Sequence, residues 1–252
     1  MGTIMAKRLM KKTLFTAIAI ATVSGCASHQ ENGERSDPLQ GFNRAMWNVN
    51  YNYLDPYVLR PVAKGWRDYV PQPIKTGLVN FTDNLDEPMS FVNRLLEGNF
   101  KQAMVHFDRF WINTIFGLGG FIDLASASEP LKKQEKREFG DMLGHYGVGT
   151  GAYVMVPGYG AATPRQDLGH LVDMTYPMLS FLGPWGLLKW GVQGVDKRAS
   201  VLDQDALLKQ SQDTYVTYRE AYFQNLKFKV SDGKSETKAS EKLDKNILDE
   251  ID

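Results

Sequence analysis

Apolar side chains recur at helical spacing through most of the body of the chain, and prolines or glycines separate the helical segments. The pattern predicts a helix over residues 39–53, after Asp37-Pro38, and a second after Pro71 and Pro73 that runs to 84. Further helices are predicted over 86–98, 100–117 and 215–228. In the 100–117 segment the spacing is carried by Phe100, Ala103, Met104, Phe107, Trp111, Ile115 and Phe116. The chain is therefore expected to be mainly α-helical.

One segment has the alternation of a strand instead. Residues 152–156 read AYVMV and lie within a glycine-rich stretch. Short strands flanked by glycine favour a hairpin or a flexible loop over a place in a larger sheet. The glycines in question are Gly147, Gly149, Gly151, Gly158 and Gly160. No Lys-Ser or Lys-Thr follows them, so backbone flexibility is a better interpretation than phosphate binding.

Two uncharged apolar runs stand out after the first 26 residues. Residues 174–188 contain Pro177 and Pro184, and residues 110–122 contain three glycines. Neither run resembles a bilayer-spanning helix, which needs roughly 20 residues, but crossing one leaflet needs only about ten. Core helices of a soluble protein are the alternative.

The first 26 residues have the organisation of a bacterial lipoprotein signal. Four basic residues precede the apolar stretch 14–23, and Val23-Ser24-Gly25-Cys26 matches the lipobox. We expect residues 1–25 to be removed and Cys26 to carry acyl chains, which hold a protein firmly on a bilayer. Ala27, rather than Asp, is typical of delivery to the outer membrane. The alternative is an ordinary secretory signal with a chance cysteine. Both Met1 and Met5 could start translation.

Composition narrows the classes of partner. Without the signal the chain carries 25 basic and 29 acidic residues, so it has no basic footprint for nucleic acid. Residues 26–38 form a polar, lipidated tether, and residues 229–252 are expected to be a solvated, disordered tail. Cys26 is the only cysteine, so no intrachain disulfide is possible. Residues 39–228 are expected to form one helical domain.

The sequence offers no active site. There is no G-x-S-x-G elbow and no H-E-x-x-H helix, and no histidine stands at metal-ligand spacing from Cys, Asp or Glu. His106 is expected to cap a packed face or meet solvent. We therefore expect no catalysis, no metal and no cofactor.

Lys189 interrupts a glycine-rich apolar segment, residues 183–191. A charge at such a position is costly unless it faces water or a partner. It could line a polar passage and meet a lipid phosphate, or it could extend to the surface along its aliphatic stem.

Many ordered motifs in this chain are similar to one family. The longer blocks are DPLQGFNR at 37–44, GLGGFID at 117–123 and YGVGTGAY at 146–153. Shorter ones lie at 61–63, 66–67, 70–71, 80–81, 84–85, 87–88, 113–114, 139–140, 143–144, 198–199, 202–208 and 215–222. Over residues 36–228 the chain resembles the MlaA (VacJ) outer-membrane lipoproteins. One departure is Arg165-Gln166-Asp167, where the family often has Arg-Asp, which puts an ion pair at that spot in doubt.

The resemblance implies a ring-like helical body in the periplasmic leaflet of the outer membrane. It implies a lipid-anchored protein that removes mislocalised phospholipids from the outer leaflet through a central amphipathic channel and so maintains lipid asymmetry. Trimeric porins and a soluble periplasmic lipid carrier are the partners it implies. Lys189 and the hairpin residues Gly147, Gly149, Gly151, Tyr153, Gly158 and Gly160 become candidates for lining or gating that channel. Two rivals stay open: a scaffold lipoprotein that docks to porins without transport, and a phospholipase, for which no residue stands out.

Overall fold

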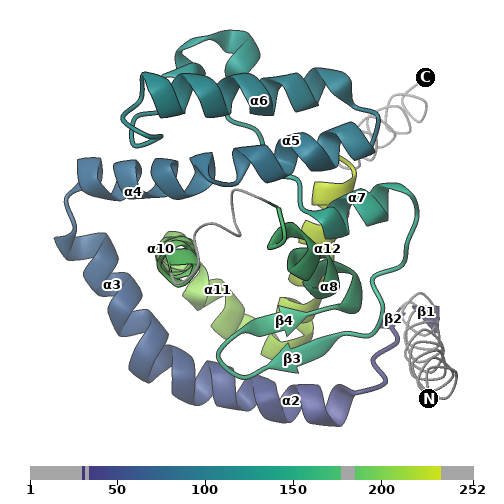
Figure 1. Ribbon diagram of the computed structural model, residues 1–252. Helices are drawn as coiled ribbons and strands as arrows, with labels where there is room; N and C mark the ends of the chain where they lie inside the picture. The colour runs from purple at the N-terminus through teal and green to yellow at the C-terminus, as the bar shows by residue number, and fades with distance from the viewer. Residues whose placement is uncertain (1–29, 32–33, 177–184, 234–252) are drawn as a thin grey trace, which may run out of the picture.

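The computed structural model describes residues 30–31, 34–176 and 185–233. A two-residue pairing of β1 (Gln30–Glu31) with β2 (Glu34–Arg35) comes first. The outer helices follow in chain order as an arc: α2 (Gln40–Asn48), the π-helical η1 (Val49–Leu59), α3 (Arg60–Tyr69) and α4 (Gln72–Asn84). Figure 1 shows this arc as one side of an open ring.

The other elements close the ring. Helices α5 (Glu87–Leu96) and α6 (Phe100–Ile115) pack on each other along one side. Two 3-10 turns, η2 (Ala125–Ala127) and η3 (Glu129–Leu131), lead to α7 (Phe139–His145) and α8 (Pro164–Asp173). The antiparallel strands β3 (Val154–Val156) and β4 (Gly160–Ala162) form a hairpin between α7 and α8.

The last helices lie inside the ring and complete it. Helix α10 (Trp185–Ser200) is seen along its axis inside the ring in Figure 1, and it packs against α3 and α4. The turn η4 (Leu202–Gln204), α11 (Asp205–Gln210) and α12 (Thr214–Val230) then return the chain to α7. The fold is mainly α-helical with a short hairpin, as the sequence predicts, and it is ring-like in outline, as the family resemblance implies.

Local chemistry explains where these helices begin. Pro71 and Pro73 flank the start of α4, where their missing N–H groups cost nothing. The Asn99 side chain accepts a hydrogen bond from the Gln102 N–H at the start of α6. Asp213 does the same for two amides at the start of α12.

The continuous helical path from α2 to α3 is longer than the predicted 39–53 segment. Residues 49–59 wind as a π-helix that contains Pro56. Proline has no N–H to donate and disrupts an α-helical ladder, and the π-helical winding extends over the residues on both sides of it. The chain therefore passes a proline without ending the helix, and α3 follows directly.

The apolar core lies where the hairpin meets α2 and α12. Its buried members are Trp47, Tyr153, Met155, Tyr215, Phe223 and Leu226. The Tyr153 ring packs at 5.8 Å from that of Tyr222, and Trp47 packs at 4.7 Å from Tyr218, measured between ring centroids. Because no disulfide is available, this packing and the polar contacts described below hold the ring closed.

Two expected boundaries differ from the structure. The tail was expected from residue 229, but α12 continues to Val230 and Lys229 is ion-paired within the fold. Asp37, in the expected tether, has a nearly buried side chain that contacts Arg219 at 3.2 Å. Residues 234–252, the signal and Cys26 lie outside the described residues, as does part of the 174–188 run.

Candidate functional site: an apolar exterior around a charged interior

Helix α6 presents its apolar residues outward. Its large apolar side chains at Phe100, Met104, Phe107, Trp111 and Ile115 are 39–68% exposed. The spacing of four, three, four and four residues places them on one face. The opposite face buries Ala103, His106, Arg109 and Asn113. The helix is thus turned inside out relative to a helix of a soluble protein, whose apolar face packs inward.

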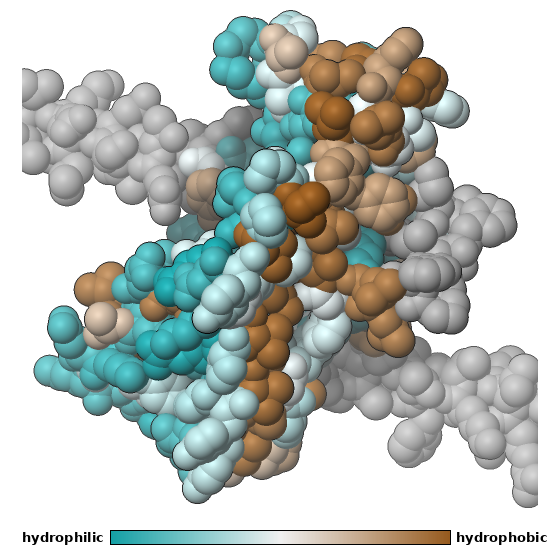
Figure 2. Space-filling model, turned by 90° about the vertical axis from the view of Figure 1, so that its left-hand side faces the viewer, coloured by the Kyte–Doolittle hydropathy of each residue, from teal (hydrophilic) through white to brown (hydrophobic). Residues whose placement is uncertain are grey.

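Exposed apolar residues continue around the outer arc. Figure 2 shows a brown band running along this side of the molecule, beside a hydrophilic surface. Exposed large side chains on the arc include Phe42, Tyr53, Tyr57, Val62, Tyr69, Ile74 and Phe81. Monomeric soluble proteins rarely expose apolar patches of this extent, which mark contact with a membrane or another protein. None of the helices described here combines the length and hydropathy needed to cross a bilayer.

Much of the interior outside the aromatic core is polar or charged. Among the described residues, 16 polar or charged residues are buried against 12 apolar ones. One buried cluster joins α5 to α6: the Arg109 Nε donates to Glu87 Oε1 at 2.7 Å, and His106 Nδ1 lies 2.6 Å from Glu87 Oε2. Arg109 also pairs with Asp123 at 3.2 Å. Buried charges persist only when they are paired in this way.

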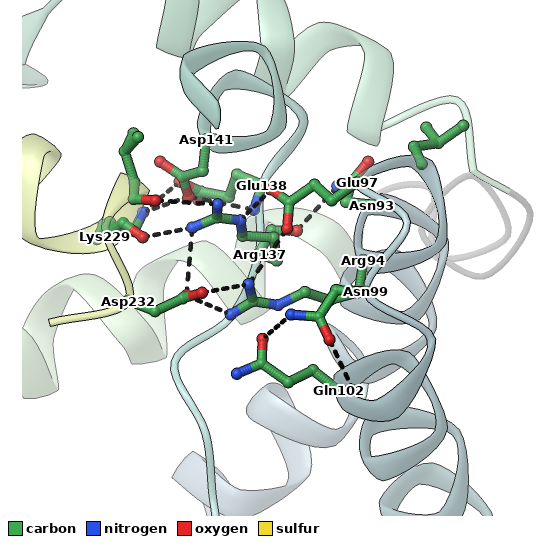
Figure 3. A network of polar contacts seen from close by, with 12 residues as sticks. Asn93, Arg94, Glu97, Asn99, Gln102, Arg137, Glu138, Asp141, Lys229 and Asp232 are labelled. Carbon is green, nitrogen blue, oxygen red and sulfur yellow. Dashed lines mark hydrogen bonds and ion pairs between the residues drawn. The ribbon is translucent and has the colours of Figure 1, made fainter. Parts of the chain in front are cut away.

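A second cluster closes the ring where the end of α12 meets α5 and α7 (Figure 3). The Arg94 guanidinium forms two hydrogen bonds with the Asp232 carboxylate, at 2.7 and 3.0 Å. Arg137 pairs with Glu97 and donates to the carbonyl of Lys229 near the end of α12. Bidentate arginine pairs fix geometry as well as charge, so this cluster holds the two ends of the ring in register.

The Lys189 side chain of α10 forms an ion pair with Asp86, the residue that precedes α5. Its ammonium lies 2.7 Å from the Asp86 carboxylate, and the two side chains are 12% and 4% exposed. Gln193, one turn later, donates to the same carboxylate at 2.9 Å. Lys189 therefore does not extend to the surface. It ties the interior helix to the start of α5.

The candidate glycines fall into two groups. Gly158 and Gly160 have φ angles of +73° and +104°, and they turn the hairpin between β3 and β4. Gly147 and Gly151 also adopt positive φ, on the approach to the hairpin, and Gly149 lies between them. Tyr153 is not near Lys189 among the described contacts. It belongs to the buried aromatic core, where its hydroxyl has no hydrogen-bond partner among the described residues.

Two asparagines hold β3 against the outer arc. Asn43 of α2 donates to the Tyr153 carbonyl at 3.0 Å and accepts from the Met155 N–H at 2.8 Å. Asn50 of η1 donates to the Val156 carbonyl at 2.9 Å and accepts from the Gly158 N–H at 2.7 Å. Each amide satisfies one donor and one acceptor of the free strand edge, as a neighbouring strand would. The hairpin is therefore docked by specific hydrogen bonds.

Within the described part of the chain, Arg165 and Asp167 form no ion pair with each other at this departure from the family pattern. Asp167 accepts from the Tyr159 hydroxyl at 2.7 Å and from the Thr163 N–H. Arg165 donates to the Val148 carbonyl at 3.0 Å, and Gln166 donates to Asp141 at 2.8 Å. All three side chains thus fasten the loops around the hairpin to each other.

The charged clusters were not identified from the sequence. His106 was expected to cap a packed face or meet solvent, but it is buried against Glu87, 19 residues earlier. Arg94, Glu97 and Arg137 carried no signal, because charged side chains ordinarily face water. The one usable signal was the polar face of α6, opposite its apolar stripe. Within the described residues no three His, Cys, Asp or Glu side chains are placed to hold a metal ion.

Comparison with known proteins shows which protein family this chain matches. Residues 35–229 match the family model described as MlaA lipoprotein. The chain is 54% identical over 248 residues to the intermembrane phospholipid transport system lipoprotein MlaA of Haemophilus influenzae, which covers 96% of this chain and 99% of the relative. It is 52% identical over 227 residues to the protein of the same name from Escherichia coli, covering 88% and 90%.

A solved structure agrees with the fold. It comes from work on the structural basis for maintenance of bacterial outer membrane lipid asymmetry, and it matches with a TM-score of 0.75 at 54% identity. The match covers 78% of this chain and all of the other. Both sequence and structure therefore point to one family.

Proposed function

Because the chain belongs to the MlaA lipoprotein family, we propose that it removes mislocalised phospholipids from the outer leaflet of the outer membrane and passes them to a soluble periplasmic carrier. The observation that carries the proposal is the inverted distribution of side chains, apolar outside and charged inside. Relatives named as intermembrane phospholipid transport lipoproteins support it. The protein acts without catalysis, as a conduit.

The proposed mechanism follows from the two surfaces. The outer stripe of α6 and the arc are immersed in acyl chains of the periplasmic leaflet, and acyl groups on Cys26 hold the body there. A phospholipid headgroup in hydrocarbon loses its hydrogen bonds to water at a cost of several kcal/mol for each polar group. A passage lined by polar and charged side chains lowers this barrier, while the tails stay in apolar surroundings.

The proposal assigns roles to the candidate residues. Lys189, with Asp86, lies on the wall of the passage, where its ammonium can exchange between the carboxylate and a lipid phosphate. The hairpin with Gly158 and Gly160 borders the passage, and its docking by Asn43 and Asn50 sets how far it moves. Trimeric porins hold the body in place in the membrane, and the hydrophilic face meets the carrier.

The test is lipid asymmetry in whole cells. Deleting the gene should raise outer-leaflet phospholipid, measured by labelling of surface-exposed phosphatidylethanolamine, and the wild-type chain should restore it. Lys189→Glu should fail to restore it, whereas Lys132→Glu, at a solvent-exposed lysine, should succeed. Normal asymmetry in the deletion strain refutes the proposal. A Lys189→Glu variant that folds and restores asymmetry fully favours a porin-docking scaffold instead.

The anchor has its own test. Cys26→Ala should leave the signal uncleaved or misplace the protein, because neither acylation nor lipoprotein processing is possible without the thiol. Membrane fractionation measures this directly. Normal outer-membrane localisation of the variant would contradict the assignment of Cys26.

A further inference from the structure

The turn that follows α6, residues 116–122, consists of apolar residues and glycines, and we call it the apolar turn. Its exposed large side chains are Phe116, Leu118 and Ile122. The next residue, Asp123, is charged, but its carboxylate faces inward and pairs with Arg109 at 3.2 Å. The apolar turn therefore presents only apolar side chains and glycine backbone to its surroundings.

Close packing holds the apolar turn on α4. The Phe121 ring lies directly against Gly77, where an added Cβ would overlap it, and Asn80 donates to the Phe121 carbonyl at 3.4 Å. Gly120 lies as closely against the Asn84 side chain, so an added Cβ would overlap that side chain too. These contacts fix the position of the turn, and its exposed tip is a built surface of the fold.

Leu118, at the tip, has a backbone conformation that leucine rarely adopts. Its φ angle is +53°, in the left-handed region, which is sterically costly for a bulky residue. Asp232 also has positive φ, but aspartate adopts this region more readily, and two hydrogen bonds from Arg94 hold it there. The Leu118 side chain is 74% exposed and has no such compensation within the fold. A strained residue with so little packing indicates a contact outside the fold.

The backbone of the apolar turn bonds its own donors. The N–H groups of residues 116, 117 and 119 donate to carbonyls of the last turn of α6, and those of residues 120–122 donate to the Gly117 and Leu118 carbonyls. Where acyl chains exclude water, a backbone group without a partner is costly. Because these donors already have partners, moving the turn out of water costs less than it would for an ordinary loop.

We propose that the apolar turn is a wedge that inserts Phe116 and Leu118 between the upper acyl chains of the periplasmic leaflet and so sets the depth of the body. The proposal rests on the proposed function, because it takes the membrane named there as the partner. The wedge continues the exposed stripe of α6 beyond Ile115 without an intervening charge. Protein interfaces carry many hydrogen bonds, and the apolar turn has no polar side chain to supply them. Acyl chains are therefore the partner that this surface fits.

A fluorescent probe at residue 118 tests the wedge. Acylation blocks the Cys26 thiol in the lipidated protein, so Leu118→Cys supplies the single free thiol for a nitrobenzoxadiazole dye. The mature lipidated protein is reconstituted into vesicles of phosphatidylethanolamine and phosphatidylglycerol that contain no other protein. Leu207→Cys is the matched control, because Leu207 is 70% exposed but lies on α11 near the exposed Lys209. Wild-type protein treated with the dye gives the background.

The probe at 118 should emit at a shorter wavelength than the probe at 207. Nitroxide groups on the acyl chains should quench it, and iodide in the water should quench it less than the control. Equal quenching of both probes by iodide overturns the wedge. Shielding of residue 118 that appears only after a porin trimer is added assigns the turn to a protein partner and overturns the lipid.

A second variant separates insertion from a structural role. Leu118→Asn should keep the thermal unfolding midpoint of the wild type or raise it, because asparagine tolerates positive φ. A lower midpoint would assign Leu118 to the packing of the fold and contradict the wedge. The deletion strain keeps the two proposals apart. Normal asymmetry there refutes transport even with an inserted probe, whereas a water-exposed probe with lost asymmetry refutes only the wedge.

Discussion

The apolar stripe of α6 gives the sharpest test of whether this body enters a membrane. Trp111 and Ile115 are 47% and 60% exposed and point away from the charged interior. Replacing both with serine should leave the fold intact, since Arg109 and Asn113 on the opposite face keep their contacts with Asp123. The loss should appear instead in the affinity for lipid.

The magnitude follows from the exposed area. About 95 Å² of Trp111 is open, taking about 200 Å² for the side chain, and this corresponds to about 2.4 kcal/mol at 25 cal/mol per Å². Ile115 adds about 1.2 kcal/mol, as 60% of a full burial worth about 2 kcal/mol. Together they contribute about 3–4 kcal/mol, so the partition coefficient should fall by about a few hundredfold.

The measurement needs a chain without acyl groups, because these alone would keep any variant on the bilayer. A chain beginning at residue 27 can be sedimented with vesicles of phosphatidylethanolamine and phosphatidylglycerol. Circular dichroism and urea unfolding should show that both forms fold. Lys101→Ser, a polar change on the same helix, is the control. Equal partitioning of the double variant and the control would refute the assignment of this stripe to the membrane.

Three further changes test the interior. Asn50→Ala removes hydrogen bonds to Val156 and Gly158 and should lower the free energy of unfolding by about 1–2 kcal/mol, with faster amide exchange confined to the hairpin; unchanged exchange there would contradict docking by this amide. Gly140→Ala should cost about 2 kcal/mol or more in a urea titration, because its Cβ would lie 2.8 Å from the Arg165 carbonyl oxygen; wild-type stability would show that α7 and α8 separate easily. Burial raises the pKa of Asp173 to about 6 from 3.8, so its contribution is complete below about pH 4 and is lost as the pH rises through 6, about 3 kcal/mol in all. The stability of wild type relative to Asp173→Asn should therefore fall between pH 4 and 7, and a constant difference would refute the shift.

Much of the helical framework could be predicted because the residues that start and mark its helices act locally. Pro71 and Pro73 mark α4, Pro88 marks α5, and the stripe from Phe100 marks α6. Such signals act within one or two turns, so they are visible in a sequence. The glycines around residues 152–156 indicated a hairpin or a flexible loop in the same way, and the structure forms the hairpin.

The path from α2 to α3 could not be predicted in this way. Pro56 is a reliable helix breaker in an α-helical ladder, and the π winding that accommodates it has no sequence signature here. The partners of Lys189 and His106 were equally hidden. Asp86 lies 103 residues from Lys189, and such a pairing depends on how α10 is placed inside the ring.

The sequence left open whether the apolar face of each helix points into the fold or out of it. The proposed function depends on this orientation. A stripe at helical spacing predicts only that one side of a helix is apolar; it does not say whether that side meets a core or a lipid. With 43% hydrophobic residues the chain has the composition of a soluble protein, so composition does not settle the question. The other side of α6 shows which way the helix faces. His106, Arg109 and Asn113 are buried, and they bond to Glu87 and Asp123. A helix whose polar side is satisfied inside the fold has only its apolar side left for the surroundings. The polar face of an amphipathic helix, matched with charges elsewhere in the chain, is therefore the feature that separates a ring with an apolar exterior from a bundle with an apolar core.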